Sequence, residues 1–310
     1  MPLTLSRKID FMALRKPAMV MSAILLLISI ISLFALKLNV GIDFTGGSII
    51  EVGYQHSVEL EPIRGALESR GFGDAIVQHF GSASEVLIRL VPEAGKDKAE
   101  LSSEIIGLLK ETSDTPVDVR RVDFVGPQVG EELTEDGGLA VLYALIAILI
   151  YVAFRFEYRF SLGAVAALVH DVLITLGIFS VLQLDFDLSV LAAILAVIGY
   201  SLNDTIVVFD RVRENFRKIR KKTSIEVINI SINQTISRTL MTSFTTLLVL
   251  LSLFFLGGEV IHAFATALII GVLVGTYSSI YVATTSALAL GISRSDMLLP
   301  EKEGEDMARP

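Results

Sequence analysis

The chain contains no cysteine, few charged residues and few histidines. Without cysteine it can have neither a disulfide framework nor thiol chemistry. Only 19% of the 310 residues are charged while 52% are hydrophobic, and the mean hydropathy is +0.64. His56 and His79 are isolated and show no carboxylate–histidine spacing typical of a metal site. We therefore expect a membrane protein without a metal or other cofactor.

Six apolar segments are long enough to cross a hydrocarbon layer of about 30 Å, which takes about 20 residues. The first segment is longer than the apolar part of a signal peptide, and no Ala-x-Ala cleavage site follows it, so we interpret it as a retained anchor. The expected membrane spans are 17–36, 138–154, 161–183, 188–209, 239–257 and 262–290. The last five form a transmembrane domain over 138–292, followed by a polar tail over 293–310.

Basic residues are distributed unevenly among the short loops. They cluster in the N-terminal segment 1–16 and in the loop 210–238, whereas Gln183–Asp187 and Gly257–Ile261 contain no Lys or Arg. The positive-inside rule predicts both termini in the cytoplasm and segment 37–137 on the outer side. Beside a membrane helix, the basic loop indicates topology and attraction to anionic lipid, not nucleic-acid binding.

Segment 37–137 has the periodicity of a small α+β domain. The alternation and spacing of apolar residues predict strands at 48–54, 75–80, 86–91 and 117–125, helices at 58–69 and 98–111, and a polar turn at 81–85. The order β-α-β-β-α-β is the ferredoxin-like pattern, a small sheet with two helices on one face. Nothing in this domain indicates catalysis, so we expect a structural or binding role.

The sequence Gly-Ile-Asp-Phe-Thr-Gly-Gly at 41–47 follows the first span. Gly46 and Gly47 permit positive φ, so the chain can turn sharply from the span into the first strand, with Asp43 placed to brace the turn. A phosphate-binding loop is disfavoured because no strand precedes the glycines and no Gly-Lys-Ser/Thr follows them.

Two aspartates, Asp171 and Asp204, lie inside expected spans. A charge there costs several kcal/mol on insertion scales unless it is neutralised, paired or hydrated, so these residues indicate function. Asn203 and Asp204 are expected to share a helix face with Tyr200. Arg238, at the start of the fifth span, is the candidate cation that could reach Asp204.

An ion pair between that arginine and Asp204 could be a two-state switch or a static buried salt bridge. Moving one charge through 100 mV is worth about 2.3 kcal/mol, enough to shift a conformational ratio by a little under fiftyfold. For Asp171 the alternatives are a proton relay and a packing network with Thr175 or another helix. His170 is not expected to pair with Asp171, because adjacent helical residues point about 100° apart. Gly271-x-x-x-Gly275 predicts a close helix contact.

Five motifs occur in an order that resembles the SecF members of the SecD/SecF family. They are Gly41–Gly47, Val125-Gly-Pro-Gln-Val-Gly-Glu-Glu132, His170-Asp171, Gly199-Tyr-Ser-Leu-Asn-Asp-Thr-Ile-Val-Val-Phe-Asp-Arg-Val-Arg-Glu-Asn215 and Ile236-Ser-Arg-Thr239. The resemblance covers nearly the whole chain, up to about Ser293.

The resemblance implies an auxiliary subunit of the bacterial Sec protein translocase, located in the inner membrane. It places the chain in the resistance–nodulation–division superfamily, whose members usually have twelve spans, so a SecD partner would supply the other half. It also implies the SecYEG translocon and translocating unfolded polypeptide as partners, and the proton-motive force as driving force. Family residues important for proton-dependent function fall on Asp204 and Arg238.

Other functions fit the sequence less well. A structural subunit that stabilises the translocon is the main alternative, and it differs in whether neutralising Asp204 abolishes function while assembly stays intact. An intramembrane aspartyl protease is disfavoured because Asp204 lies in Leu-Asn-Asp-Thr and not in Gly-x-Gly-Asp. A small-molecule exporter is disfavoured by the half-length chain and its single small outer domain. We therefore expect no enzymatic activity.

Overall fold

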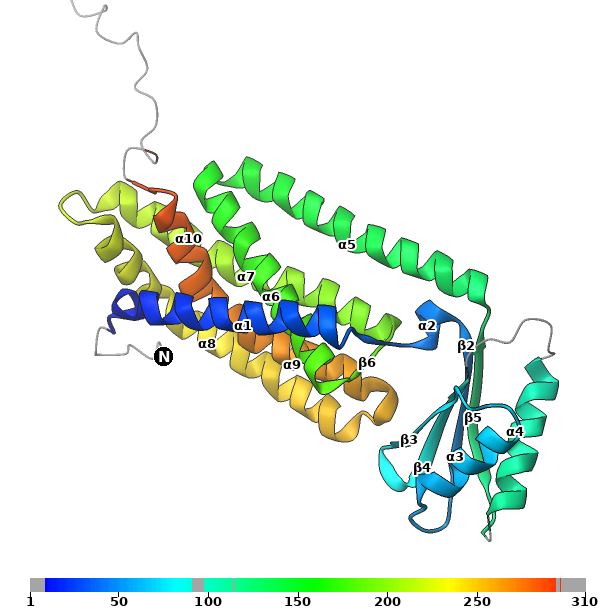
Figure 1. The fold of residues 1–310 in the computed structure, drawn as a ribbon. Coiled ribbons are helices and arrows are strands. Elements are labelled where there is room, and N and C mark those ends of the chain that lie inside the picture. The colour runs from blue at the N-terminus through cyan, green and yellow to red at the C-terminus, as the bar shows by residue number, and fades with distance from the viewer. Residues whose placement is uncertain (1–8, 91–97, 114, 294–295, 297–310) are drawn as a thin grey trace, which may run out of the picture.

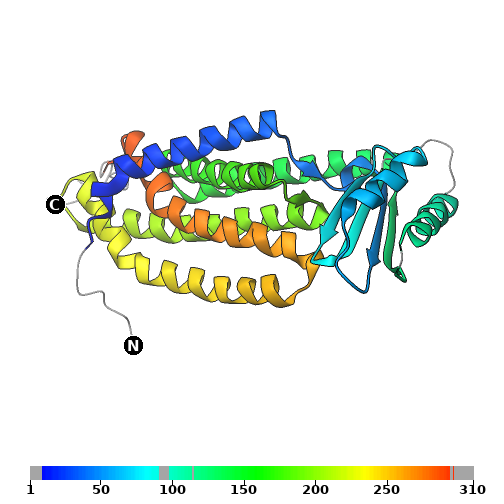
Figure 2. The same ribbon diagram turned by 60° about the horizontal axis from the view of Figure 1, so that its bottom comes forward.

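The computed structural model describes residues 9–90, 98–113, 115–293 and 296. An elongated helical bundle forms most of the molecule, and a small α/β domain sits at one end of it (Figures 1 and 2). Residues 1–8 of the predicted cytoplasmic N-terminus and nearly all of the predicted tail 293–310 lie outside the described residues.

Six helices of the described part are long and apolar enough to cross a membrane, as expected. Their bounds are α1 Arg15–Ala35, preceded by the turn η1 Phe11–Leu14; α5 Pro127–Arg155; α6 Tyr158–Leu182; α7 Leu188–Lys218; α8 Ser224–Leu256; and α9 Glu259–Ser278, continued by the π-helical turn η2 Ser279–Ala283 and by α10 Thr284–Ala289. Several helices extend beyond the apolar runs, because polar ends continue the helix past the hydrophobic layer.

Local capping explains where three of these helices begin. Pro127 is the first residue of α5, where its missing N–H costs no hydrogen bond. The Asp187 carboxylate accepts a hydrogen bond from the backbone N–H of Val190 and caps α7. Thr223 and Glu226 form a capping box at the start of α8.

The α/β domain consists of residues 47–125 between α1 and α5. Its elements are β2 Gly47–Gly53, α3 Leu60–Ser69, β3 Ile76–Phe80, β4 Ser82–Leu90, α4 Lys98–Thr112 and β5 Asp118–Val125. The antiparallel sheet has the order β3-β4-β2-β5. All four strands and both helices occur in the predicted sequence order.

One prediction in this domain is wrong: the polar turn at 81–85. The connection is a tight turn at Gly81, which has φ +76, and β4 already begins at Ser82. Glu85 pairs with Gly53 in the ladder between β4 and β2. The polar residues at this end of β4 still form backbone hydrogen bonds with the neighbouring strands. The polarity of their side chains therefore did not show where the turn ends.

The core of the α/β domain lies between one face of the sheet and the two helices. Its fully buried members include Ile50, Val52, Ile88, Leu67 and Ile105. The opposite face of the sheet carries charged residues and borders a cavity of about 380 Å³ that also reaches the turn between α6 and α7. The sheet therefore has an apolar side towards its helices and a mixed side, with charged and apolar residues, towards the bundle.

A tight junction joins the α/β domain to the bundle. The short strands β1 (Asn39–Val40) and β6 (Asp185–Phe186) pair in parallel. The single-turn helix α2 (Ile42–Thr45) follows β1. Gly46 and Gly47 have φ +69 and +127, so the predicted sharp turn is confirmed. A Cβ on Gly47 would also press against the Leu90 carbonyl oxygen, which leaves no room for a side chain.

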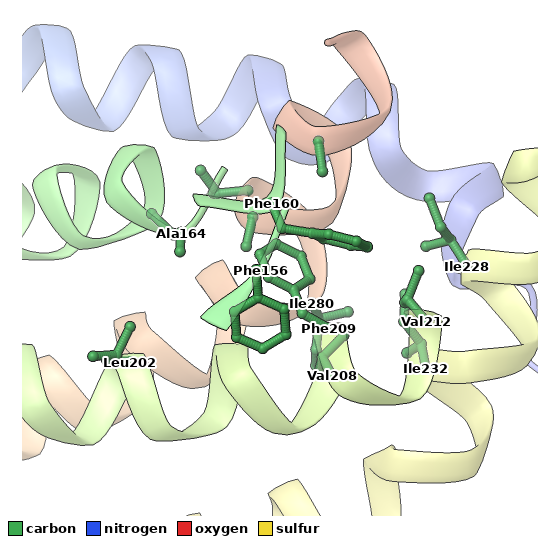
Figure 3. Packing of buried hydrophobic residues seen from close by; sticks show 14 of the residues in the cluster. Phe156, Phe160, Ala164, Leu202, Val208, Phe209, Val212, Ile228, Ile232 and Ile280 are labelled. Carbon is green, nitrogen blue, oxygen red and sulfur yellow. The ribbon is translucent and has the colours of Figure 1, made fainter. Parts of the chain in front are cut away.

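The largest apolar cluster of the bundle holds α6, α7 and α8 together. The rings of Phe160 and Phe209 pack at a tilt of 52° with their centroids 4.7 Å apart, and Phe156 packs on both (Figure 3). Val208, one turn after Asp204, is fully buried in the same cluster. This packing fixes the rotation of α7 and therefore the direction in which Asp204 points.

Small residues bring α9 against α7. A Cβ on Gly271 would overlap the Val197 side chain, and a Cβ on Gly275 would lie 3.1 Å from Cβ of Ser201. The predicted Gly-x-x-x-Gly helix contact is confirmed. It lets the backbones approach closely enough for short polar side chains to meet between the helices.

Candidate functional site

Asp204 lies in the interior of the bundle, where three elements meet. Its side chain is on α7 and only 8% of the residue is exposed. Thr239 of α8 donates a hydrogen bond to its Oδ1 over 2.6 Å, and Ser279 of η2 donates to its Oδ2 over 2.5 Å. Both donors are neutral hydroxyl groups, which can also accept a hydrogen bond after rotation.

Arg238 does not form an ion pair with Asp204 among the described residues. The side chain is exposed and borders a cavity of about 300 Å³ together with Asp210, Glu214 and Gln234. The reason is helical geometry: Thr239 faces Asp204, so its neighbour on α8 points about 100° away. The guanidinium still interacts electrostatically with the carboxyl over a longer distance. The structure therefore shows the separated arrangement and not a static buried salt bridge.

Asn203 points away from this site and is exposed. Tyr200 instead donates to Ser243 of α8 over 3.0 Å, and Ser243 contacts Thr276 of α9 over 2.6 Å. The prediction that Asn203 shares a helix face with Asp204 is wrong: Asp204 is buried and Asn203 is exposed. Adjacent helical residues point about 100° apart, and the tight contact of α7 with α9 turns Asp204 inwards.

Asp171 occupies a second buried polar centre, with 1% of the residue exposed. Its Oδ2 accepts hydrogen bonds from Ser201 of α7 over 2.5 Å and from Ser278 of α9 over 2.7 Å. Thr175 donates to the backbone carbonyl of Asp171 and not to the carboxylate. The predicted network with another helix is therefore observed, but the part expected of Thr175 is not.

His170 pairs with Asp171, contrary to the expectation from their adjacent positions. His170 Nδ1 lies 2.9 Å from Asp171 Oδ1, and both residues are buried. The Cβ atoms do diverge, but rotation about the side-chain bonds brings the polar atoms together. The alternative in this interior is an unsatisfied buried group, which costs more than the rotation.

Two consecutive serines link the two buried aspartates. Ser278 donates to Asp171, and Ser279, the next residue, donates to Asp204. They lie where α9 changes into the π-helical turn η2, and such turns are frequent at functional sites. The sequence analysis missed these serines. Their only signal was a pair of small polar residues within an otherwise apolar span.

Asp43 lies in the junction with the α/β domain, far along the chain from the helix that it contacts. Its carboxylate accepts a hydrogen bond from the backbone N–H of Leu188 over 3.0 Å, at the first residue of α7. Asp43 therefore braces the start of the helix that carries Asp204. That it also braces the glycine turn stays a prediction. No group of three or more His, Asp or Glu side chains that could hold a metal ion occurs within the part of the chain that the structure describes.

Side chains of the sheet also contact this junction. Gln78 of β3 donates to Asp185 over 3.3 Å, and Arg89 of β4 contacts the carbonyl oxygen of Val40. Asn39 donates to the same Asp185 carboxylate over 2.7 Å. The α/β domain is thus connected through polar contacts to the turn between α6 and α7, the helices that carry the two buried aspartates.

Comparisons with known protein families match both the helical bundle and the glycine turn. The family model described as "Protein export membrane protein SecD/SecF, C-terminal" matches residues 105–293, and "SecD/SecF GG Motif" matches residues 31–58. The second match contains the turn formed by Gly46 and Gly47.

Curated relatives and solved structures match nearly the whole chain. It is 55% identical to protein translocase subunit SecF of Vibrio alginolyticus over 97% of this chain and 96% of the relative, and 47% identical to that of Pseudomonas aeruginosa over 97% and 98%. The structure of SecDF from Thermus thermophilus, described as a translocon-associated membrane protein, is 40% identical with a TM-score of 0.85 and covers 94% of this chain. This chain spans 39% of that SecDF chain. SecDF in a super-membrane-facing form gives a TM-score of 0.68 at the same identity. The chain therefore belongs to the SecD/SecF family of protein-export membrane proteins, as a SecF-type member.

Proposed function

We propose that this chain is an auxiliary subunit of the Sec protein translocase. Together with SecD it uses the proton-motive force to promote export of polypeptides through SecYEG, with protons as the coupling ion and without a cofactor or catalytic activity of its own. The names of the SecF and SecDF relatives support the translocase role. The buried carboxyls support the coupling to protons.

The single observation that carries the proton coupling is the environment of Asp204. A carboxyl buried among three helices, held by two hydroxyls and with its nearest candidate cation outside, can bind or release a proton without breaking a fixed ion pair. When it is protonated, its own O–H must be a donor, so at least one of Thr239 and Ser279 must rotate from donor to acceptor. Protonation thereby changes the contacts of α8 and η2 with α7.

Arg238 belongs to the same proposal as a group at the entrance to the site. When ionised, Asp204 attracts Arg238, and a modest change in the rotation of α8 would bring them closer. Asn203 is a polar side chain exposed on an apolar helix, so we assign it to the face that meets SecD. Asp171 is connected to Asp204 through Ser278 and Ser279, and it is the second carboxyl of the coupling path.

The junction provides a route by which a change at Asp204 reaches the α/β domain. Asp43 contacts the first residue of α7, and the pairing of β1 with β6 fixes the domain to the turn before that helix. We class the domain as ferredoxin-like from its strand order, and place it on the outer side of a bacterial inner membrane with both termini in the cytoplasm. In this proposal the α/β domain lies on the side of the membrane where exported polypeptide emerges.

The test is complementation of a SecF-deficient strain with Asp204→Asn, scoring export and the amount of SecD that co-purifies. Asp210→Asn is the matched control, because Asp210 lies on the same helix but is exposed and paired with Arg155 over 3.0 Å. We expect Asp204→Asn to abolish export with a normal complex, and Asp210→Asn to retain export. Normal export with Asp204→Asn would favour the alternative, a structural subunit that stabilises the translocon.

A further inference from the structure

A chain of buried polar groups runs from Asp171 to helix α1. His170 Nε2 lies 3.1 Å from Ser22 Oγ, and Ser22 Oγ lies 2.9 Å from the Tyr277 hydroxyl. Tyr277 in turn donates to the carbonyl oxygen of Ala18 over 2.7 Å. The chain therefore joins α6, α1 and α9 in the interior of the bundle.

Counting hydrogens gives the direction of each contact. The Tyr277 hydroxyl has one hydrogen, and it is used on the Ala18 carbonyl, which can only accept. The hydrogen between Ser22 and Tyr277 must therefore come from Ser22. The Ser22 oxygen is then left as an acceptor for its contact with His170, so the proton in that contact lies on His170 Nε2.

The contact between His170 Nδ1 and Asp171 Oδ1 also requires a proton. If neither atom carried one, a nitrogen lone pair would face a carboxylate oxygen at 2.9 Å. The proton lies on Nδ1, giving an imidazolium beside a carboxylate, or on Asp171, giving a neutral pair. In both cases the two residues together hold one proton more than a neutral histidine beside an ionised aspartate.

We infer that His170 and Asp171 form a proton-binding site, and that the arrangement described here is its loaded form. That this proton is used in export rests on the proposed function. That the pair binds a proton follows from the contacts of His170 with Ser22 and Asp171. The ionisable groups that face the pair from other elements are Tyr277 of α9, Tyr281 of η2 beside it, and Asp204 of α7 through the serine pair. α1 contributes the neutral Ser22 hydroxyl.

Loss of the proton has a defined structural consequence. A neutral His170 that keeps its hydrogen on Nδ1 must accept a hydrogen bond at Nε2. Among the residues that the structure describes, only Ser22 is placed to donate it. Ser22 has one hydrogen, so its hydrogen bond to Tyr277 is then lost. The state of the site therefore controls a contact between α1 and α9, and α9 continues directly into the π-helical turn that carries Ser279.

The site can be tested by nitrogen-15 NMR of histidine-labelled SecD–SecF complex in lipid bilayers. The chain has only four histidines, and the His170 signals are those that disappear in His170→Asn. Between about pH 5 and pH 8, where histidine ordinarily changes its charge, we expect a loaded state with Nε2 protonated. In that state Nδ1 is also protonated, or infrared spectra show a protonated carboxyl that Asp171→Asn removes. A neutral ring beside an ionised Asp171 throughout this range would overturn the inference.

Two tyrosine variants separate the hydrogen-bond chain from general packing. Tyr277→Phe removes the acceptor for Ser22, and one lost hydrogen bond should lower the proton affinity of the site roughly threefold or more, about half a pH unit in its midpoint. Tyr281→Phe, in the ring that packs against Tyr277 at a tilt, should leave the midpoint unchanged. Equal effects of both variants would contradict the assigned chain. These results do not depend on export, so a normal Asp204→Asn phenotype would refute the proposed function without touching this site.

Discussion

Replacing Asp185 by asparagine should stabilise the junction between the α/β domain and the bundle at neutral pH. The Asp185 carboxylate accepts hydrogen bonds from Asn39 and Gln78 and lies near Arg89 and Asp187. Burial is the largest influence on it and raises the pKa of Asp185 above its ordinary value, although the two hydrogen bonds and the Arg89 charge oppose this. Asparagine removes the buried charge but keeps only one of the two accepting oxygens. Because Asn39 and Gln78 donate to different oxygens, one of these two amides must turn its own oxygen towards the new NH2 group.

The ionised Asp185 carboxylate destabilises the folded chain relative to the unfolded chain. Because the pKa of Asp185 is raised in the folded state, ionisation costs the folded state free energy at pH values above that raised pKa. The cost falls as the pH drops through the raised pKa towards the unfolded value near 3.9 and is then absent. Each pH unit between the two pKa values is worth about 1.4 kcal/mol.

Hydrogen exchange of the junction amides measures this effect locally. The Gly41 N–H donates to the Phe186 carbonyl over 2.8 Å and reports the opening of the β1–β6 contact. We expect slower exchange at neutral pH in Asp185→Asn, by up to about tenfold for each pH unit of raised pKa. The difference from the unchanged protein should vanish in acid. Faster exchange at neutral pH would mean that attraction to Arg89 outweighs burial, and would refute the reasoning.

Two further changes test the packing and the charge around Asp204. Gly271→Val should prevent α9 from packing on α7, because a Cβ there overlaps Val197. The amount of folded chain in the membrane should therefore fall. The control variant Gly199→Val, with open space at its Cβ, should accumulate normally. Similar loss in both variants would argue against the helix contact. Arg238→Lys keeps the charge but not the planar guanidinium, so export in the complementation assay should be partly impaired, and Arg238→Ala should be severely impaired. Unchanged export with Arg238→Ala would remove this arginine from the coupling mechanism.

Most of the fold could be predicted from local sequence patterns. Runs of apolar residues longer than about 20 predict spans because only a helix satisfies its own backbone within lipid. The alternating pattern around Ile50 and Ile88 predicted strands for the same kind of local reason. The turn before β4 was misplaced because Ser82, Ser84 and Glu85 are polar residues at the open end of the strand, yet this end of the strand still pairs through its backbone. Side-chain polarity and backbone pairing are independent at the exposed end of a hairpin.

Only part of the candidate site could be predicted from the sequence. Asp171 and Asp204 stood out because ionisable side chains in apolar helices are costly. Their partners did not, because a serine or threonine within a span is common and reveals its role only when helices are packed. Ser278 and Ser279 became informative once each was found to donate to a different aspartate.

The sequence by itself determined the six apolar helices, the inserted α/β domain, the glycine turn at its entrance and the two buried carboxyls. These features depend on burial, backbone freedom and periodicity along a single segment. Only the tertiary structure decided that His170 pairs with Asp171, that Arg238 and Asn203 face outwards, and that Asp43 contacts α7. Those outcomes depend on how neighbouring helices rotate against one another, which is set by contacts such as Gly271 against Val197 between residues distant in the chain.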